Sequence, residues 1–336
     1  MVSSTDRPTA QLRRDIGIFG AAFLALNAMI GAGIFALPGK IAVNAGLLSP
    51  WLFLVVGALF ITIVLTFAEL SSYYDRTGGP VLYATDAFGP FAGFSTGWAI
   101  YLSRMTAFAA NANVMATYLA SLHDIFASDL ARGTIITTVT VGLTWANVMG
   151  VRDGVRTMAV FTFLKVTPLV LMILLGLQHV TGATLIPGGP VFFDGIGDTT
   201  LLLIYAYVGF ETLGVTAGET SQPRRTLPKA YVGSMLGTSL LYFFVVLVFV
   251  SIIPANSYEG ATLVDVAERS QDLLVRLSSQ WLLFFLSAAI FRGPYWLHHA
   301  LHFRWRKNVC CLPGSAAYMP GSQHRTARSS LWVAWL

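Results

Sequence analysis

The sequence predicts an all-α polytopic membrane protein, and three observations lead to this fold class. The chain has 336 residues, of which 55% are hydrophobic and only 11% are charged. In soluble domains about a quarter of all residues are charged. The mean hydropathy of this chain, +0.66, is correspondingly high. The hydrophobic residues form successive runs, several of them near the roughly 20 residues that a helix needs to cross a bilayer. Two of these runs are interrupted by glycines, which indicates a transporter more than a simple anchor.

The basic charge does not indicate a nucleic-acid partner. The net charge is +5 and the pI is about 9.3, but the positive residues fall in short loops between hydrophobic runs, where they determine topology. We therefore expect the chain to lie in a lipid bilayer and to bind no nucleic acid. The only cysteines, Cys310 and Cys311, are adjacent, which is the spacing of neither a metal site nor a disulfide framework.

The first run, residues 16–38, follows a short polar tail at 1–15 and contains the sequence NAMIGAGIFALP. Gly31 and Gly33 lie near its middle, where each glycine costs a helix about 0.5–1 kcal/mol relative to alanine. They predict a broken helix whose free backbone groups line a cavity. The alternative is a notch of small residues for helix packing. A dinucleotide fingerprint is excluded, because Ala36 replaces its third glycine and no strand precedes it.

The later runs follow in order along the chain, separated by short polar segments. The second begins with Pro50 in its first turn, where a missing N–H costs least, and a polar turn at 71–80 follows it. The third is longer than the bilayer is thick and must tilt. The eighth, 280–291, is too short to cross. The predicted spans after the first are 48–70, 91–122, 134–149, 158–177, 199–217, 231–253 and 280–291.

Lysine and arginine are distributed unequally between alternate loops. One side has Arg7, Arg13, Arg14, Arg76, Arg152, Arg156, Arg224, Arg225 and Lys229, whereas the other has Lys40, Arg132, Arg269 and Arg276. The positive-inside rule then places the N-terminus in the cytoplasm. We expect the protein to lie in the cell membrane. No cleavable signal peptide is expected, because the first run is too long for one.

Three ionisable residues fall inside predicted spans, where charge is expensive and indicates function by default. Lys165 lies about eight residues, or ~12 Å, from either end of its helix, which is too deep for its side chain to reach the interface. For Arg104, structural pairing is an equal alternative to function. Glu211 is expected either to hydrogen-bond loosened backbone nearby or to bind a ligand directly.

The sixth span repeats the pattern of the first. Gly209, Gly214 and Gly218 interrupt it, and aromatic residues flank Gly209. Two glycine-interrupted spans in corresponding positions of two halves predict a substrate site at the middle of the membrane. Free N–H groups at the start of a half-helix suit a carboxylate, and freed carbonyls suit an ammonium, so we expect a zwitterion.

At these residues the sequence resembles the amino acid–polyamine–organocation (APC) superfamily of permeases. The resemblance is carried by NAMIGAGIFALPG in the first span, GFE in the sixth, and the segment GETSQPRRTLPKA. That segment is similar to the family pattern E-x-x-x-P-x-R-x-x-P-x-A, with Glu219, Pro223, Arg225, Pro228 and Ala230 in place. The resemblance covers about residues 14–290.

The resemblance implies a LeuT-type fold of two inverted five-helix repeats, with a first repeat at about 16–178 and a partial second repeat at 199–291. It implies a secondary transporter for an amino acid or related amine, with no cofactor and no metal. Lys165 is similar to a lysine that takes the place of a sodium ion, which favours proton coupling or exchange, with Lys165 and Glu211 as coupling residues. The implied substrate-binding residues are Ile30, Gly31, Ala32, Gly33, Ile34, Tyr205, Ala206, Tyr207 and Gly209.

Beyond Phe291 the sequence departs from this pattern. Residues 292–336 are rich in Arg, His, Pro and Ser and lack a helical period. His298, His299 and His302 lack a fourth ligand for a metal site, and a basic tail on anionic lipid is the ordinary functional alternative. The abrupt change suggests translation in a shifted reading frame, which would leave the second repeat incomplete.

Two other functions compete with a permease. One is a membrane remnant or partner subunit that does not transport. The other is an intramembrane enzyme, which we do not expect because no HExxH, GxSxG or paired-aspartate motif lies in the spans. The sequence leaves the substrate side chain, the direction of transport and the oligomeric state open.

Overall fold

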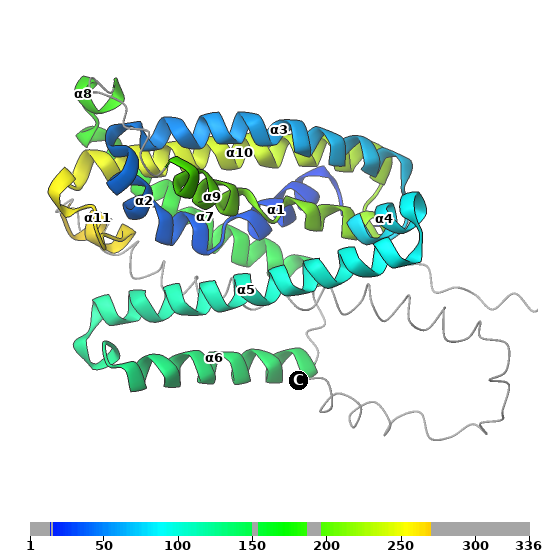
Figure 1. The fold of residues 1–336 in the computed structure, drawn as a ribbon, viewed down its shortest axis with the longest axis horizontal. Helices are drawn as coiled ribbons and strands as arrows, with labels where there is room; N and C mark the ends of the chain where they lie inside the picture. The colour runs from blue at the N-terminus through cyan, green and yellow to red at the C-terminus, as the bar shows by residue number, and fades with distance from the viewer. Residues whose placement is uncertain (1–13, 15, 150–153, 187–195, 270–336) are drawn as a thin grey trace, which may run out of the picture. The chain divides into compact units, whose positions relative to one another are not determined.

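The computed structural model describes residue 14 and residues 16–149, 154–186 and 196–269. The regular elements in these ranges are helices (Figure 1), and extended pairing is limited there to an isolated bridge between Ile16 and Thr220. The predicted all-α class is therefore confirmed. The predicted eighth span and the basic tail at 292–336 lie outside the described residues.

The first span is a broken helix, as its glycines predict. Helix α1 (Ile18–Met29) ends at Ile30, whose ψ of 90° leaves the helical region, and α2 (Ala32–Ala45) begins after an extended Gly31. The predicted end at Pro38 is wrong, because α2 continues through Pro38 to Ala45. The next residue, Gly39, lets the helix pack closely, since an added Cβ would lie 2.6 Å from the Ala261 carbonyl oxygen.

The unbroken helices match the predicted spans to within a few residues at most ends. Prolines in the first turn begin several of them, where no N–H is required. They are α3 (Ser49–Tyr73, after the 3₁₀ turn Gly46–Leu48), α5 (Pro90–Leu122), α6 (Asp129–Met149), α7 (Gly154–Gly176) and α10 (Pro223–Ile252). Short elements lie between these helices or follow α10: η2 (Asp124–Phe126), η3 (Leu177–His179), α8 (Gly182–Leu185), η5 (Ala255–Ser257) and α11 (Leu263–Arg269).

One short helix, α4 (Pro80–Phe88), was not predicted. It lies between Gly79 and Gly89, whose φ values of 50° and 89° stop the helix at both ends. Residues without a Cβ adopt such angles freely. Helix α4 packs against α5. The first three residues of the predicted polar turn at 71–80 belong to α3, and residues 74–79 lead into α4.

The sixth span is also broken. Helix α9 (Ile196–Tyr207) ends before Gly209, whose φ is 129°, and η4 (Phe210–Glu219) continues as a 3₁₀ helix of 10 residues. Runs of 3₁₀ helix longer than about four residues are uncommon and often mark a hinge or strain. The predicted interruption by glycine is therefore confirmed at Gly209.

The broken helices pack within a frame of unbroken ones. Helix α10 runs along α3 (Figure 1) and also contacts α1 and α7. Helix α2 packs against α9, and α5 contacts α2 and α6. The core that results is rich in aromatic residues, including Phe53, Tyr207 and Tyr242, whose rings meet edge to face or tilted.

Loops assigned to one side of the membrane meet at one end of the helices. The Ile16 N–H donates to the Glu219 carbonyl at 3.1 Å, and the Ser221 N–H donates to the Ile16 carbonyl at 2.9 Å. An ion pair of 3.8 Å joins Arg224 to Asp75. These contacts join the start of α1 to the segment before α10, and the α3–α4 turn to the first turn of α10. The charge count also places these loops on one side.

By length and hydropathy, four helical stretches within the described residues can cross a membrane. They are Ala32–Tyr73, Thr162–His179, Gly197–Glu219 and Pro223–Ile252. The first includes the turn at Gly46–Leu48 between α2 and α3, and α1 adds a shorter apolar helix. The chain is therefore a multi-pass membrane protein.

Candidate functional site

The two helix breaks lie against each other. A Cβ added to Gly33 would lie 2.9 Å from the Ala206 Cα, and one added to Gly209 would lie 2.5 Å from the Ala28 carbonyl oxygen. The glycines therefore serve two purposes, because they release the backbone from the helix and let the two broken spans touch. The packing-notch alternative describes part of this arrangement but does not explain the freed backbone groups.

Side chains from two other helices satisfy carbonyls at the end of α1. The Lys165 Nζ, on α7, donates to the Asn27 carbonyl and, at 2.6 Å, to the Ile30 carbonyl. The Tyr242 hydroxyl, on α10, lies 2.9 Å from the Met29 carbonyl oxygen and 3.2 Å from that of Ala206. Tyr242 thus connects the ends of α1 and α9, whose last carbonyls have no partner within the helix.

The start of α2 is held by a residue that the sequence did not single out. The Ala32 N–H donates to Asn111 Oδ1 on α5 at 2.7 Å. Among the described residues, the N–H groups of Gly31, Gly33 and Ile34 have no partner, although Gly33 and Ile34 are buried. An unpaired buried N–H costs about 1–3 kcal/mol, so this terminus is suited to an acceptor from a ligand.

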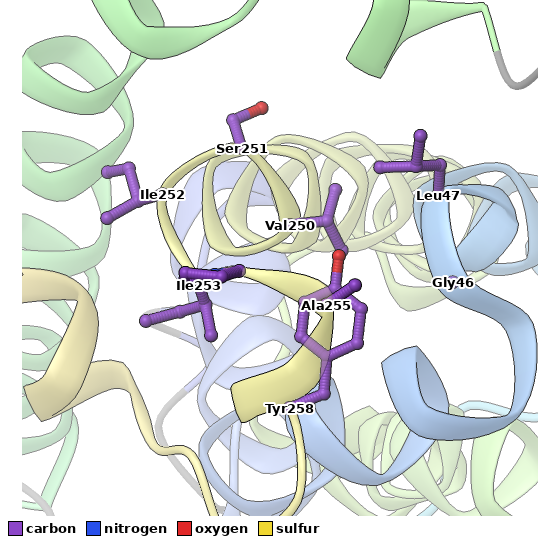
Figure 2. Close-up of a pocket in the computed structure, with 9 residues that line it drawn as sticks. Gly46, Leu47, Val250, Ser251, Ile252, Ile253, Ala255 and Tyr258 are labelled. Carbon is purple, nitrogen blue, oxygen red and sulfur yellow. The ribbon is translucent and has the colours of Figure 1, made fainter.

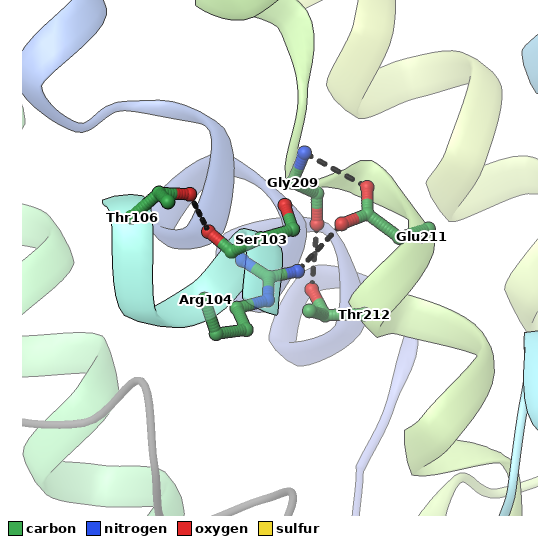
Figure 3. Close-up of polar contacts among 6 residues, drawn as sticks. All are labelled: Ser103, Arg104, Thr106, Gly209, Glu211 and Thr212. Carbon is green, nitrogen blue, oxygen red and sulfur yellow. Dashed lines mark hydrogen bonds and ion pairs between the residues drawn. The ribbon is translucent and has the colours of Figure 1, made fainter. Parts of the chain in front are cut away.

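Glu211 hydrogen-bonds the loosened backbone, which was one of its two expected roles (Figure 3). Its Oε2 accepts from the Gly209 N–H at 2.8 Å, and its Oε1 lies 2.6 Å from Nη2 of Arg104 on α5. The Thr212 hydroxyl donates to the Gly209 carbonyl at 2.7 Å. The structural pairing considered for Arg104 is therefore confirmed, and the pair connects α5 to the second break.

The remaining residues predicted to bind substrate differ in how far their side chains are buried. Ile30, Ile34, Ala206 and Tyr207 are buried, whereas Tyr205 is 36% exposed. The Tyr207 hydroxyl donates to the Phe53 carbonyl at 2.7 Å, so this side chain points toward α3. Ala206 provides its carbonyl to Tyr242. The structure brings the backbone of all these residues to the breaks, and their contact with a substrate stays a prediction.

Sequence reasoning missed three side chains at the site, and two of them, Asn111 and Tyr242, hydrogen-bond the backbone at the breaks. Asn111 lies seven residues after Arg104 on α5, which places both on one helix face. This spacing could have identified Asn111 from the sequence. Tyr242 lies in an apolar run of α10, and nothing local distinguishes it from a core tyrosine. A third residue, Asn27, has a buried Oδ1 with no hydrogen-bond partner among the described residues.

A hollow at the far end of α10 is not part of this site (Figure 2). It has a volume of about 370 Å³ and is lined by Gly46 and Leu47 of the 3₁₀ turn η1 (Gly46–Leu48), by the end of α10, and by Ala255 and Tyr258. None of the residues at the helix breaks lines it. Within the described part of the chain, no group of three His, Cys, Asp or Glu residues is placed to hold a metal.

Replacing Arg104 with methionine is expected to lower the free energy of unfolding by about 2–4 kcal/mol. The Arg104 and Glu211 side chains are only 17% and 18% exposed, so the variant leaves a largely buried carboxylate without its counter-charge. The double variant Arg104→Met/Glu211→Gln is expected to recover most of this loss, because neither charge remains. Thermal unfolding of the detergent-purified protein measures both.

The control is Arg76→Met. Arg76 pairs with Asp86 at 3.8 Å, but these side chains are 71% and 41% exposed, and exposed pairs contribute only about 0–1 kcal/mol. Equal losses in the Arg104 and Arg76 variants would show that the Arg104–Glu211 pair is screened by solvent and does not hold the second break.

Comparison with known proteins identifies the family. The family model described as "Amino acid permease" matches residues 16–292. The branched-chain amino acid permease BcaP of Bacillus subtilis is 27% identical over 265 residues, which are 74% of this chain and 57% of the relative. The serine/threonine exchanger SteT of the same organism is 28% identical over 253 residues, covering 73% of this chain and 56% of SteT.

A plant relative matches the same proportion of the chain. The chloroplastic cationic amino acid transporter 9 of Arabidopsis thaliana is 28% identical over 262 residues, which are 72% of this chain and 46% of the relative. The chain thus spans about half the length of these relatives. Because the family model covers most of the sequence and both helix breaks, this chain belongs to the amino acid permease family of the APC superfamily.

Proposed function

We propose that this chain binds an amino acid between the two helix breaks and moves it across the cell membrane as a secondary transporter. The observation that carries the proposal is the meeting of the breaks around backbone groups that lack partners. Buried N–H groups at the start of α2 face no acceptor from the described residues. Non-helical backbone at membrane depth is tolerated where it lines such a site.

The N-terminus of α2 is suited to the substrate carboxylate. Gly31, Ala32, Gly33 and Ile34 present consecutive N–H groups at the positive end of the helix dipole, which is a favourable position for an anion. Neither Gly31 nor Gly33 places a Cβ in the way. A carboxylate here would satisfy the N–H groups that have no acceptor among the described residues.

The end of α9 and the last turn of α1 are suited to the ammonium group. Among residues 205–209, the carbonyls of Tyr207 and Val208 have no donor from the described residues, whereas those of Tyr205, Ala206 and Gly209 already accept hydrogen bonds. The negative end of a helix dipole favours a cation. The buried Asn27 Oδ1 supplies a further acceptor next to the first break. The aromatic side chain of Tyr205, which is partly exposed, is available to cover the substrate.

The names of the relatives support an α-amino acid as the substrate class. One names branched-chain amino acids, another serine and threonine, and a third cationic amino acids. Their side chains differ, so the shared element is the amino and carboxylate groups. The two half-helix ends of this chain offer hydrogen-bond partners to these groups. Residues farther from the breaks would contact the substrate side chain.

Coupling to protons or exchange is proposed in preference to sodium. A sodium ion needs several oxygen ligands, and the Asn27 and Ile30 carbonyls already accept from the Lys165 ammonium. Because Lys165 already donates to both of these oxygens, they are less available as ligands for a sodium ion. The arginine-rich loops at the start of α1 and before α10 are proposed to face the cytoplasm.

Uptake into proteoliposomes tests the proposal. We expect saturable uptake of at least one of leucine, threonine and arginine, unchanged when sodium is replaced by choline. Uptake should rise with an inward proton gradient, or with unlabelled amino acid inside the vesicles if the protein is an exchanger. Binding without uptake would support the non-transporting alternative, and strict sodium dependence would contradict the proposed coupling.

A further inference from the structure

Helix α5 contacts both broken spans through residues spaced seven apart. Arg104 reaches Glu211 at the second break, and Asn111 reaches Ala32 at the first. The Tyr118 hydroxyl donates to the Phe35 carbonyl of α2 at 2.8 Å. Seven residues are nearly two helical turns, so these side chains form one line along α5. Through this line of side chains α5 contacts both broken spans.

Asn111 is held in a fixed orientation by its own helix. Its Nδ2 donates to the Ala107 carbonyl one turn earlier at 2.8 Å, while its Oδ1 accepts from the Ala32 N–H. The carboxamide also lies beside Gly31, since a Cβ added there would be 3.5 Å from Oδ1. Asn111 therefore occupies one of the N–H groups, that of Ala32, which the proposed substrate carboxylate requires.

We propose that Asn111 holds the N-terminus of α2 in the empty protein and gives up the Ala32 N–H to the carboxylate of the substrate. This inference rests on the proposed function, because it assigns the carboxylate to the same terminus. A carboxamide oxygen is a neutral equivalent of a carboxylate oxygen in shape and hydrogen bonding. Hydrogen bonds to a charged acceptor are about twice as strong as neutral ones, so the carboxylate displaces the amide.

The exchange makes Asn111 a specificity-determining residue. A ligand with a carboxylate replaces the bond that it breaks with a stronger one, whereas a simple amine offers no acceptor to the Ala32 N–H. An amine therefore leaves Asn111 in place and gains nothing from the start of α2. The predicted result is selection of amino acids over the amines that share their side chains.

The chain offers a matched control for Asn111. Asn113, two residues later on α5, makes the same bond to its own helix, from Nδ2 to the Ala109 carbonyl at 2.9 Å. It is exposed, and its Oδ1 accepts from Arg132 Nη2 at 3.1 Å. Substitutions at Asn113 thus reproduce the local change in α5 without touching α2.

The experiment measures binding to the full-length purified protein by calorimetry. The probes are leucine, threonine and arginine, each compared with the amine left when its carboxylate is removed. Asn111→Ala is expected to bind the preferred amino acid two- to tenfold more tightly, because about 0.5–1.5 kcal/mol of competing hydrogen bond is removed. Asn111→Asp is expected to bind it at least tenfold more weakly, because a fixed carboxylate fills the site, and to leave amine binding undiminished.

Other outcomes would overturn the inference. Weaker amino acid binding in Asn111→Ala would show that Asn111 is itself a ligand of the substrate. Identical affinities in the Asn111 and Asn113 variants would show that Asn111 has no part in recognition. Stronger amine binding in Asn111→Ala, equal to the gain for the amino acid, would show that the residue does not discriminate between them.

A measurement without ligand separates this inference from the proposed function. Hydrogen exchange of the peptide containing residues 31–36 is expected to be several-fold faster in Asn111→Ala than in the wild type, and unchanged in Asn113→Ala. If no amino acid binds the wild type, the proposed function fails and the displacement step fails with it. Unchanged exchange in Asn111→Ala would instead overturn the role of Asn111 at α2, whatever binds.

Discussion

Replacing Gly209 with alanine is expected to abolish uptake and to lower the free energy of unfolding by about 3–5 kcal/mol. The φ of Gly209 is 129°, a region that costs a residue with a Cβ about 1–3 kcal/mol. The added Cβ would also lie 2.5 Å from the oxygen and 2.7 Å from the carbon of the Ala28 carbonyl. The Ala28 carbonyl belongs to the backbone and cannot rotate away as a side chain can. The two breaks must therefore move apart in the Gly209→Ala variant.

The comparison that tests this prediction is a series of glycine-to-alanine variants. Gly233, within α10, has nothing within 4 Å of its added Cβ, and alanine in a helix interior is favoured by about 1 kcal/mol. Gly31→Ala meets only Asn111 at 3.5 Å, whereas Gly33→Ala meets the Ala206 Cα at 2.9 Å. We expect thermal stability to fall in the order Gly233, Gly31, Gly33, Gly209. A Gly209 variant as stable as the Gly233 variant would contradict the close contact of the breaks.

The broken spans were predictable because their cause is local. Gly31, Gly33 and Gly209 lie inside hydrophobic runs, and glycine in such a position is unfavourable unless the backbone leaves the helix. The end of the first span was not predictable in the same way. Pro38 was interpreted as a stop, but its helix continues to Ala45. There Gly39 lies against the carbonyls of Tyr258 and Ala261, more than 200 residues away, a contact that the local sequence does not reveal.

The partners of the ionisable residues were not predictable because they are distant in sequence. Arg104 and Glu211 are separated by 107 positions, and Lys165 and Ile30 by 135. The cost of a charge in the membrane indicated that each needs a partner, but not which one. Asn111 and Tyr242 are neutral, so no such cost identified them. Their importance follows only from the backbone groups that they satisfy.

Replacing Lys165 with methionine is expected to reduce uptake by about 100-fold or more. Lys165 is 2% exposed, and methionine fills a similar volume without its donors. The Asn27 and Ile30 carbonyls would then lose their ammonium partner, at a cost of about 1–3 kcal/mol each. Lys40→Met is the control, since Lys40 is exposed on α2. Uptake by proteoliposomes and thermal unfolding measure the two consequences separately.

Sodium provides the sharper test of what Lys165 does. In Lys165→Ala the space that the ammonium occupied is vacated beside two carbonyl oxygens, which are ligands that a small hard cation prefers. We therefore expect sodium to raise the thermal stability and amino acid binding of Lys165→Ala relative to choline, and to leave the wild type unchanged. Sodium-stimulated uptake by the wild type that survives in Lys165→Ala would contradict this role, because the ion would then be bound elsewhere. A sodium response confined to the alanine variant would show that the lysine ammonium and a cation compete for the same carbonyls at the end of α1.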